Sequence, residues 1–175
     1  DEPVIYDLQT LRCVLISRVP MHLASIDNFT LMPLRDGQSI ASEINSYFKA
    51  HRDHNLLMQI CKLIGFGVYE SFLNSYDKEV YVVSICGRQS SGKSYLLNRI
   101  FGTRFDVSSA RCTDGIWMSI AKIKTKDSER LFVVLDCEGL FSSRRTETDE
   151  MKMCLTLTAV SNVTILNQNV SFSRY

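Results

Sequence analysis

The chain has 175 residues, of which 45% are hydrophobic and 22% charged, enough for one well-buried α/β domain with an appendage. Its 20 basic and 19 acidic residues give a net charge of +1, which excludes a strong overall field that would attract nucleic acid or an anionic membrane. Every apolar stretch is shorter than the ~18 residues that a membrane span requires. The composition therefore describes an ordinary globular domain and names no partner.

Residues 1–77 carry a mixed pattern, which we interpret as a small helical N-terminal region. After the turn signal Asp36-Gly37, apolar residues at helical spacing predict two short amphipathic helices, near 40–48 and 57–64. His51 and His54 lie three residues apart. No further ligand has matching spacing, so we interpret both histidines as surface residues rather than a metal site.

Six cysteines are spread singly along the chain, without a C-x-x-C pair. This spacing favours free thiols over a disulfide framework and predicts a cytoplasmic location. Three N-x-[ST] sequons begin at Asn28, Asn162 and Asn169, and in a reducing compartment they are expected to be silent.

From residue 78 onward the pattern becomes regular and predicts an α/β fold. The polar turn at 126–129 indicates that the strands on either side of it form an antiparallel pair. We expect a P-loop NTPase three-layer sandwich over 78–175, with a partial and mostly parallel sheet. Its predicted strands are 79–86, 115–123, 131–135 and 163–166, and its predicted helices are 94–101 and 151–157.

The octet GRQSSGKS at 87–94 lies between a predicted strand and a predicted helix and satisfies G-x-x-x-x-G-K-[ST]. Gly87 and Gly92 allow backbone N–H groups to turn inward and form an anion nest. The start of the following helix adds unpaired N–H groups, and Lys93 supplies an ammonium for the β- and γ-phosphates. Ser94 is expected to hold Mg²⁺ through its hydroxyl. The octet therefore predicts a site for the phosphates of a nucleotide.

A second motif, Asp136-Cys137-Glu138-Gly139, follows the predicted strand 131–135 directly. At this place in a P-loop fold an acidic side chain reaches the Mg²⁺ shell, and a glycine N–H meets the γ-phosphate. Between the two motifs, Thr113 is the candidate for a switch residue that binds Mg²⁺ and senses the γ-phosphate. The same connector carries other hydroxyls, those of Thr103, Ser108 and Ser109, which from the residues alone stay open as alternatives.

Three blocks, GRQSSGKSYLLNRIFG, RCTDGIWMSI and LFVVLDCEGLFSSRR, resemble the guanylate-binding proteins and the very large interferon-inducible GTPases of the dynamin-related group. The resemblance covers about residues 80–166. It implies a Mg²⁺-dependent domain that binds GTP, hydrolyses it to GDP and phosphate, and often pairs with a second copy across the nucleotide face. It also implies that Thr113 is the switch threonine.

The chain departs from this family at several places. Ser90 stands where guanylate-binding proteins carry an arginine finger, and Leu140 follows Gly139 where small GTPases have a water-orienting glutamine. The attacking water would then be held by the backbone or by Ser90. Arg88, Arg144 and Arg145 either approach a phosphate or a partner, or are exposed solubilising residues. A guanine-reading motif does not occur before Tyr175, and we interpret the base-binding part as missing from the chain.

These motifs together predict Mg²⁺-dependent GTP binding and hydrolysis, controlled by loops near 105–115 and 138–150. The alternatives are a nucleotide-gated or inactive interaction module and, third, an ATPase. Expected partners are a guanine nucleotide and a second copy of the chain, with no nucleic acid. Ser90 and Thr113 are the expected catalytic residues, and Ser94, Thr113 and Asp136 the expected metal ligands. The expected nucleotide-binding residues are Gly87, Arg88, Gln89, Ser90, Ser91, Gly92, Lys93, Ser94, Tyr95, Thr113, Asp136 and Gly139.

Overall fold

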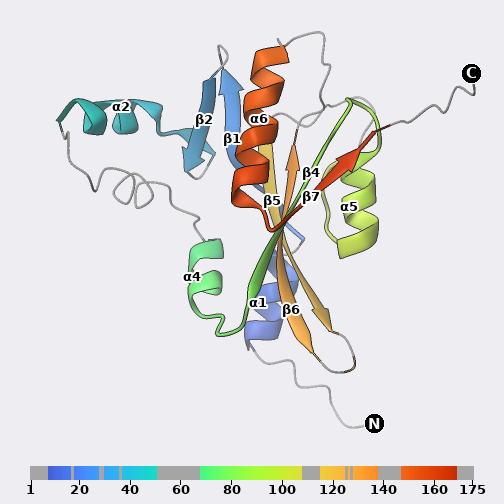
Figure 1. The fold of residues 1–175 in the computed structure, drawn as a ribbon. Coiled ribbons are helices and arrows are strands. Elements are labelled where there is room, and N and C mark those ends of the chain that lie inside the picture. The colour runs from blue at the N-terminus through green and yellow to red at the C-terminus, as the bar shows by residue number, and fades with distance from the viewer. Residues whose placement is uncertain are drawn as a thin grey trace, which may run out of the picture.

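The computed structural model describes residues 8–16, 18–27, 30–35, 37–50, 68–107, 115–124, 126, 128–137 and 147–168. Within these ranges the chain forms one seven-stranded mixed sheet in the order β3-β2-β1-β5-β6-β4-β7 (Figure 1). The strands are β1 (Met21–Asp27), β2 (Thr30–Arg35), β3 (Gln38–Ser39), β4 (Val80–Gly87), β5 (Ile116–Lys124), β6 (Glu129–Cys137) and β7 (Val163–Asn167). The helices are α1 (Leu8–Ile16), α2 (Ala41–Ala50), α4 (Val68–Asn74), α5 (Lys93–Phe101) and α6 (Glu147–Val160).

One end of the sheet is parallel. Strand β4 pairs in parallel with β6 on one side and with β7 on the other, so that Ser84 lies opposite both Leu135 and Thr164. Strands β4 and β6 are rich in β-branched and other apolar residues, as expected for strands that are covered on both faces. Since they run in the same direction, their carboxyl ends, Gly87, Cys137 and Asn167, lie at one edge of the sheet. The predicted strands near these positions are therefore confirmed.

The prediction of a mostly parallel sheet is wrong. Only the two pairings of β4 are parallel among the described residues, whereas β1–β2, β2–β3, β1–β5 and β5–β6 are antiparallel. For β1–β2, β2–β3 and β5–β6 the reason is connection length, because a short turn can join only antiparallel neighbours. The polar turn at 126–129 and the turn at Gly37 are of this kind, and the predicted antiparallel pair at 126–129 is confirmed as β5 and β6.

The N-terminal region was predicted to be helical. It contains helices, but it also supplies three strands, β1, β2 and β3, to the same sheet. Strand β1 pairs with β5, with Met21 opposite Met118. The junction is close, because a Cβ on Gly115 would lie 1.9 Å from the carbonyl oxygen of Ala24. The predicted helix near 40–48 is confirmed as α2, while the predicted helix at 57–64, with His51 and His54, lies outside the described residues.

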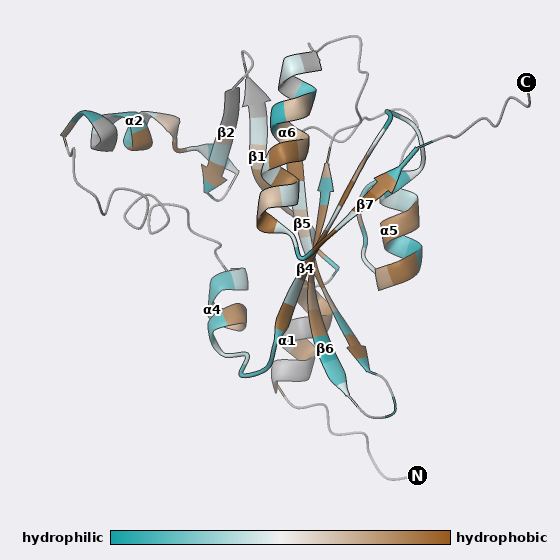
Figure 2. Cartoon of the chain, viewed as in Figure 1, coloured by the Kyte–Doolittle hydropathy of each residue, from teal (hydrophilic) through white to brown (hydrophobic). Residues whose placement is uncertain are grey.

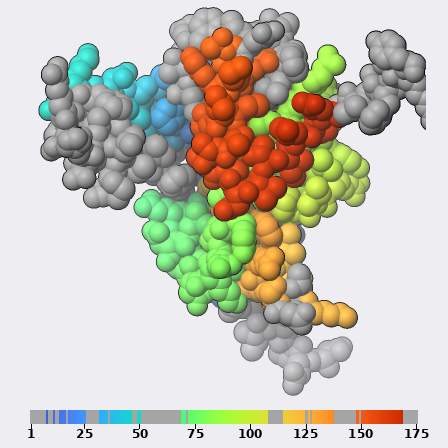
Figure 3. All heavy atoms as spheres, viewed as in Figure 1, coloured from blue at the N-terminus to red at the C-terminus, as the bar shows by residue number. Residues whose placement is uncertain are grey.

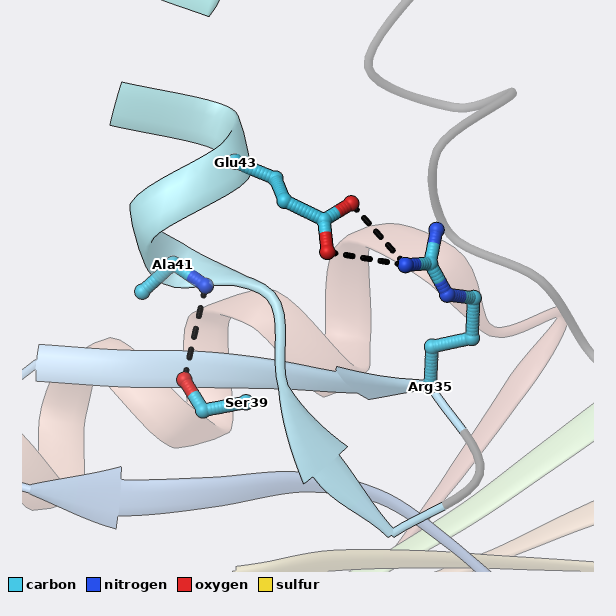
Figure 4. Close-up of polar contacts among 4 residues, drawn as sticks. All are labelled: Arg35, Ser39, Ala41 and Glu43. Carbon is cyan, nitrogen blue, oxygen red and sulfur yellow. Dashed lines mark hydrogen bonds and ion pairs between the residues drawn. The ribbon is translucent and has the colours of Figure 1, made fainter. Parts of the chain in front are cut away.

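Helix α2 is held to the β2–β3 hairpin by polar contacts (Figure 4). The Arg35 guanidinium donates to both carboxylate oxygens of Glu43, at 2.8 and 2.9 Å. At the start of the helix, the hydroxyl of Ser39 accepts a hydrogen bond of 3.4 Å from the Ala41 N–H, in the manner of a helix cap. Residues 35–43 therefore form one local unit at the antiparallel end of the sheet.

Helices pack against both faces of the sheet and give three layers. One hydrophobic core lies between the sheet and helices α1, α4 and α6, and includes Tyr69, Phe72, Met153 and Leu157 from the helices. A smaller core lies on the opposite face, where Leu97 of α5 packs with buried strand residues and Phe105. The alternation of side chains along each strand explains why β5 and β6 supply residues to both cores.

Helix α6 and strand β7 present an apolar outer surface. Figure 3 shows the two elements side by side on one face, and Figure 2 shows hydrophobic residues on both. Helix α6 starts at Glu147, four residues before its predicted start, and has apolar residues on its outer side as well as its inner side. Five apolar side chains of the two elements are at least 55% exposed, namely Met151, Leu155 and Val160 on α6, and Val163 and Leu166 on opposite faces of β7. None of the helices described here is long and apolar enough to span a bilayer.

Candidate functional site

The octet 87–94 forms the turn between β4 and α5, as predicted. Gly87, the last residue of β4, passes so close to β7 that a Cβ would lie 2.0 Å from the carbonyl oxygen of Asn167. Ser90 and Gly92 both have left-handed backbone angles, with φ of 58° and 80°. Glycine adopts this conformation without steric cost and serine does so rarely. Glycines therefore occupy the close approach to β7 and one of the two left-handed positions, and Ser90 occupies the other.

Lys93 lies inside this turn rather than in solvent. It is the first residue of α5 and its side chain is buried, with the ammonium donating to the carbonyl oxygen of Arg88 at 3.0 Å. The same carbonyl accepts the N–H of Ser91 at 3.3 Å. A buried ammonium whose hydrogen bond goes to a neutral carbonyl attracts an anion strongly.

Ser94 and Asp136 meet across the parallel end of the sheet. The Ser94 hydroxyl donates to Asp136 Oδ2 at 2.6 Å, although the two residues are 42 positions apart. Ser94 follows β4 through the octet, and Asp136 is the penultimate residue of β6. Parallel pairing of β4 and β6 therefore explains why a serine of one motif and a carboxylate of the other lie in contact.

Asp136 is an almost fully buried carboxylate with an unused oxygen. Its side chain is 1% exposed, and Oδ1 has no hydrogen-bond partner of ordinary geometry among the described residues. Burial raises the pKa of Asp136 to about 6, although the Ser94 hydroxyl, the Lys93 charge and the Cys137 N–H favour the ionised form. A buried carboxylate oxygen without a donor is costly unless a proton or a cation neutralises it.

The residues present fit a Mg²⁺ site. Mg²⁺ prefers oxygen ligands and is bound through one or two protein groups, with phosphate and water completing the octahedron. The Ser94 hydroxyl and the Asp136 carboxylate are such a pair, and Lys93 is close enough to affect the titration of Asp136. Among the residues that the structure describes, no group of three or more His, Cys, Asp or Glu side chains could hold a metal alone. The donor set therefore suits a metal shared with phosphates better than a structural metal.

The structure brings together the central part of the predicted site and leaves other parts apart. Ser90 lies exposed in the turn, and Arg88 is exposed as well. Tyr95 is 54% exposed on α5, where its hydroxyl accepts from Arg99 Nε at 3.1 Å, so it lies on the helix surface. The residues that come together in and beside the turn are Gly87, Gln89, Ser91, Gly92, Lys93, Ser94 and Asp136. Thr113, Gly139, Leu140, Arg144 and Arg145, with Ser108 and Ser109, lie outside the described residues.

Three cysteines lie next to residues of the site or on the neighbouring helix α6. Cys86 precedes Gly87, Cys137 follows Asp136, and Cys154 lies on α6, all as free thiols, as predicted. The Cys137 thiol donates to the Ile85 carbonyl at 3.0 Å. Contact with the Cys137 thiol, together with burial, raises the pKa of Cys86 to about 12. The Cys86 thiol is therefore protonated at neutral pH and serves as a packing group rather than a nucleophile.

Sequence reasoning missed two asparagines next to the site. Asn98 on α5 anchors the connector that follows, because its Oδ1 accepts from Thr103 Oγ1 and from the Phe105 N–H, both at 2.9 Å. Its Nδ2 donates to the Phe105 carbonyl at 2.8 Å. The Thr103 hydroxyl is therefore engaged away from the Asp136 site. The second residue is Asn167 on β7, whose Nδ2 donates to the Ser91 carbonyl at 3.1 Å. The sequence signal for Asn98 was its position in the last turn of the helix that ends at Gly102. Asn167 had no such signal, because its contact depends on the pairing of β7 with β4.

Comparison with known proteins finds relatives over about half of the chain. The chain is 36% identical over 98 residues to mouse interferon-induced very large GTPase 1, which covers 52% of this chain and 4% of that protein. It is 43% identical over 94 residues to the Sey1 homolog of Dictyostelium discoideum, covering 49% of this chain and 10% of that protein. To Neurospora crassa Sey1 it is 40% identical over 114 residues, or 57% of this chain and 13% of that one. The chain thus spans a small part of the length of these relatives.

The match to a protein family extends over more of the chain. The URGCP-like GTPase domain family matches residues 71–173, a range that begins in α4 and contains β4, the octet, Asp136 and β7. Both the motifs and the elements that bring them together lie inside it. The chain therefore belongs to the URGCP-like GTPase domain family.

Proposed function

We propose that this chain binds GTP together with Mg²⁺ and hydrolyses it to GDP and phosphate. The observation that carries the proposal is the contact of Ser94 with the buried Asp136, whose second carboxylate oxygen has no hydrogen-bond partner among the described residues. Buried Lys93 lies beside it, in a turn that connects a parallel strand to a helix. Membership of a GTPase domain family supports GTP as the nucleotide.

The chain's own residues have separate tasks in this proposal. Lys93 leaves the Arg88 carbonyl and neutralises the β- and γ-phosphates. The ammonium thereby exchanges a neutral hydrogen-bond acceptor for a charged one. Ser94 and Asp136 hold the metal, directly or through water. Mg²⁺ at this pair would supply positive charge that offsets the negative charge of the phosphates. Ser90 and Thr113 are proposed to orient the attacking water.

The connector from 105 to 115 is proposed as the first switch loop. Its beginning is fixed, because Phe105 is buried and its backbone is bonded on both sides to Asn98. Its end is fixed too, because Gly115 is packed against the Ala24 carbonyl of β1. A segment between two fixed points can change shape with the nucleotide without disturbing the sheet. The segment near 138–150, whose last four residues form the start of α6, is proposed as the second switch. Pairing across the nucleotide face is proposed as the mode of assembly.

A nucleotide-gated interaction module with negligible turnover is the second candidate. It is favoured by Ser90, which occupies the place of the arginine finger of the guanylate-binding proteins, and by Leu140 in place of a water-orienting glutamine. In this case the nucleotide would control assembly without rapid hydrolysis.

Two measurements on the full chain test these proposals. GTP and ATP binding are titrated for wild type and for Lys93→Ala, with Lys126→Ala as the control, because Lys126 is an exposed lysine of the β5–β6 turn. We expect Lys93→Ala to weaken GTP binding at least about 100-fold, as for a buried charged contact to phosphate. Unchanged affinity in this variant would refute the site. Phosphate release per molecule is then followed against protein concentration: a rise supports a self-activated GTPase, and a flat rate near background supports the module.

A further inference from the structure

The last residue of β7 holds the phosphate-binding turn from outside. In register, Asn167 lies opposite Gly87, the first residue of the octet. The contact is so close that the Asn167 carbonyl would lie 2.0 Å from a Cβ at Gly87. The Asn167 side chain then reaches the fifth residue of the octet and donates to the Ser91 carbonyl at 3.1 Å. One residue of β7 thus contacts the turn at two points.

This hydrogen bond has a consequence for the next N–H group. The peptide unit between Ser91 and Gly92 is planar, so its carbonyl and its N–H point in opposite directions. When Asn167 holds the Ser91 carbonyl, the Gly92 N–H points away from β7. A carbonyl turned the other way would face the nest and repel a phosphate. Gly92 is also the residue directly before Lys93, so the orientation of this peptide affects the start of α5.

We propose that Asn167 is a positioning residue for nucleotide binding, which orients the Ser91–Gly92 peptide so that its N–H faces the phosphates. The inference rests on the proposed function, because it assumes that the turn binds a triphosphate. Asn167 touches no phosphate in this account and acts through the backbone of the octet.

The other end of β7 provides a matched control. Asn162 also ties β7 to β4, because its Oδ1 accepts from the Val82 N–H at 2.7 Å. It lies at the opposite end of the strand from the octet. Asn162→Ala and Asn167→Ala each remove one side-chain hydrogen bond between β7 and its neighbour. Only the second removes a bond to the phosphate-binding turn.

The test is a titration of the full chain with a fluorescent GTP analogue, beside a thermal melt of each variant. We expect Asn167→Ala to bind about fivefold more weakly, from the loss of one net hydrogen bond. Asn167→Asp should bind about tenfold more weakly or worse, since it turns a carboxylate toward the Ser91 carbonyl. Asn162→Ala should bind within about twofold of wild type, because its bond lies away from the turn. Equal affinities for the two alanine variants, or a loss in Asn167→Ala that only follows its melting temperature, would overturn the proposal.

A second measurement separates this inference from the proposed function. Hydrogen exchange of the peptide 87–97 is compared in the nucleotide-free chain. We expect faster exchange in Asn167→Ala and unchanged exchange in Asn162→Ala, because only the former loosens the octet. A wild type without affinity for GTP would refute the proposed function, and the exchange comparison would then decide whether Asn167 orders the turn. Identical exchange in both variants refutes that ordering.

Discussion

The two ends of the sheet are built differently and serve different purposes. At the parallel end, β6, β4 and β7 run the same way and bring Asp136, the octet and Asn167 to one edge. At the antiparallel end, β3, β2 and β1 follow one another through short turns and join the sheet along β5. Parallel strands collect their carboxyl ends at one edge, whereas antiparallel hairpins distribute theirs to both.

The two ends of the sheet also differ in the contacts that their charged and closely packed groups make. The parallel end carries a buried carboxylate with an unused oxygen and a buried ammonium, both of which are costly in the absence of a ligand. The antiparallel end shows ordinary stabilising contacts, such as the Arg35–Glu43 pair and the close packing of Gly115 on β1. Three predictions test whether the ends differ in this way, beginning with the largest expected effect.

The strongest test is at the junction between β1 and β5. Gly115→Ala would place a Cβ 1.9 Å from the Ala24 carbonyl, at a residue whose φ is 66°. The backbone has to separate to remove this clash, so we expect the free energy of unfolding to fall by about 4 kcal/mol or more. Gly37→Ala is the control, because Gly37 has φ of 78° but open space around its Cβ position. It should lose only about 1 kcal/mol in the same urea titration. Similar losses in both variants would show that β1 does not support the sheet.

The second prediction concerns the parallel end, where a substitution is expected to raise the free energy of unfolding rather than lower it. The folded-state pKa of Asp136 is raised to about 6 from 3.8, so the folded chain binds this proton more tightly than the unfolded chain. Stability from this group is therefore lost as pH rises from about 4 to 6 and stays lower above pH 6. In metal-free buffer we expect Asp136→Asn to be about 2 to 3 kcal/mol more stable than wild type at pH 7.5, with the difference vanishing near pH 4.

Urea unfolding at the two pH values, in the presence of a chelator, measures this effect. Ser94→Ala is the companion variant, because it removes the hydroxyl that donates to Asp136 and should destabilise the ionised form further. An Asp136→Asn variant that is less stable than wild type at pH 7.5 would show that the carboxylate stabilises the fold, contrary to the comparison above.

The smallest expected effect tests the attachment of α1. The buried hydroxyl of Tyr69 on α4 lies within hydrogen-bonding distance of the carbonyls of Ile16 and Val19, at the end of α1. Burial also raises the pKa of Tyr69 to about 12. Tyr69→Phe should lower the free energy of unfolding by about 1 to 2 kcal/mol, because buried acceptors lose their donor. Tyr81→Phe, which loses a bond to exposed Glu79, should change it by less than about 0.5 kcal/mol. Thermal melts that shift equally for both would contradict an attached α1.

Most of the parallel end could be predicted from the sequence. An apolar run, the octet and a helical pattern follow each other directly in β4 and α5, so local signals and final structure agree. The start of α6 at Glu147 was missed because its first turn is polar and hydrophobic periodicity begins only at Met151. The antiparallel end was missed because β1 and β2 mix polar with apolar residues, and the pairing of β1 with β5 is decided by tertiary contact.

The site residues that could be predicted are those that belong to a recognisable sequence motif. Lys93, Ser94 and Asp136 were predicted from spacing, and the structure brings Ser94 and Asp136 into contact with Lys93 nearby. Asn167 was not, because nothing in its local sequence relates it to Ser91, 76 residues earlier. Only the register of β7 against β4 makes the connection. The function of Thr113 and Gly139 stays a prediction, since both lie outside the described residues.

The apolar outer surface of α6 and β7 bears on the colloidal behaviour of the chain. Five large apolar side chains are exposed on these two elements, and β7 is the last strand of the described sheet. A strand at the edge of a sheet offers unpaired backbone groups to any similar strand that it meets. The net charge of +1 and an isoelectric point near 7.8 provide little electrostatic repulsion at neutral pH. Protein chemistry on this chain is therefore best begun in low-salt buffer well away from pH 7.8, where molecules repel one another before their apolar faces meet.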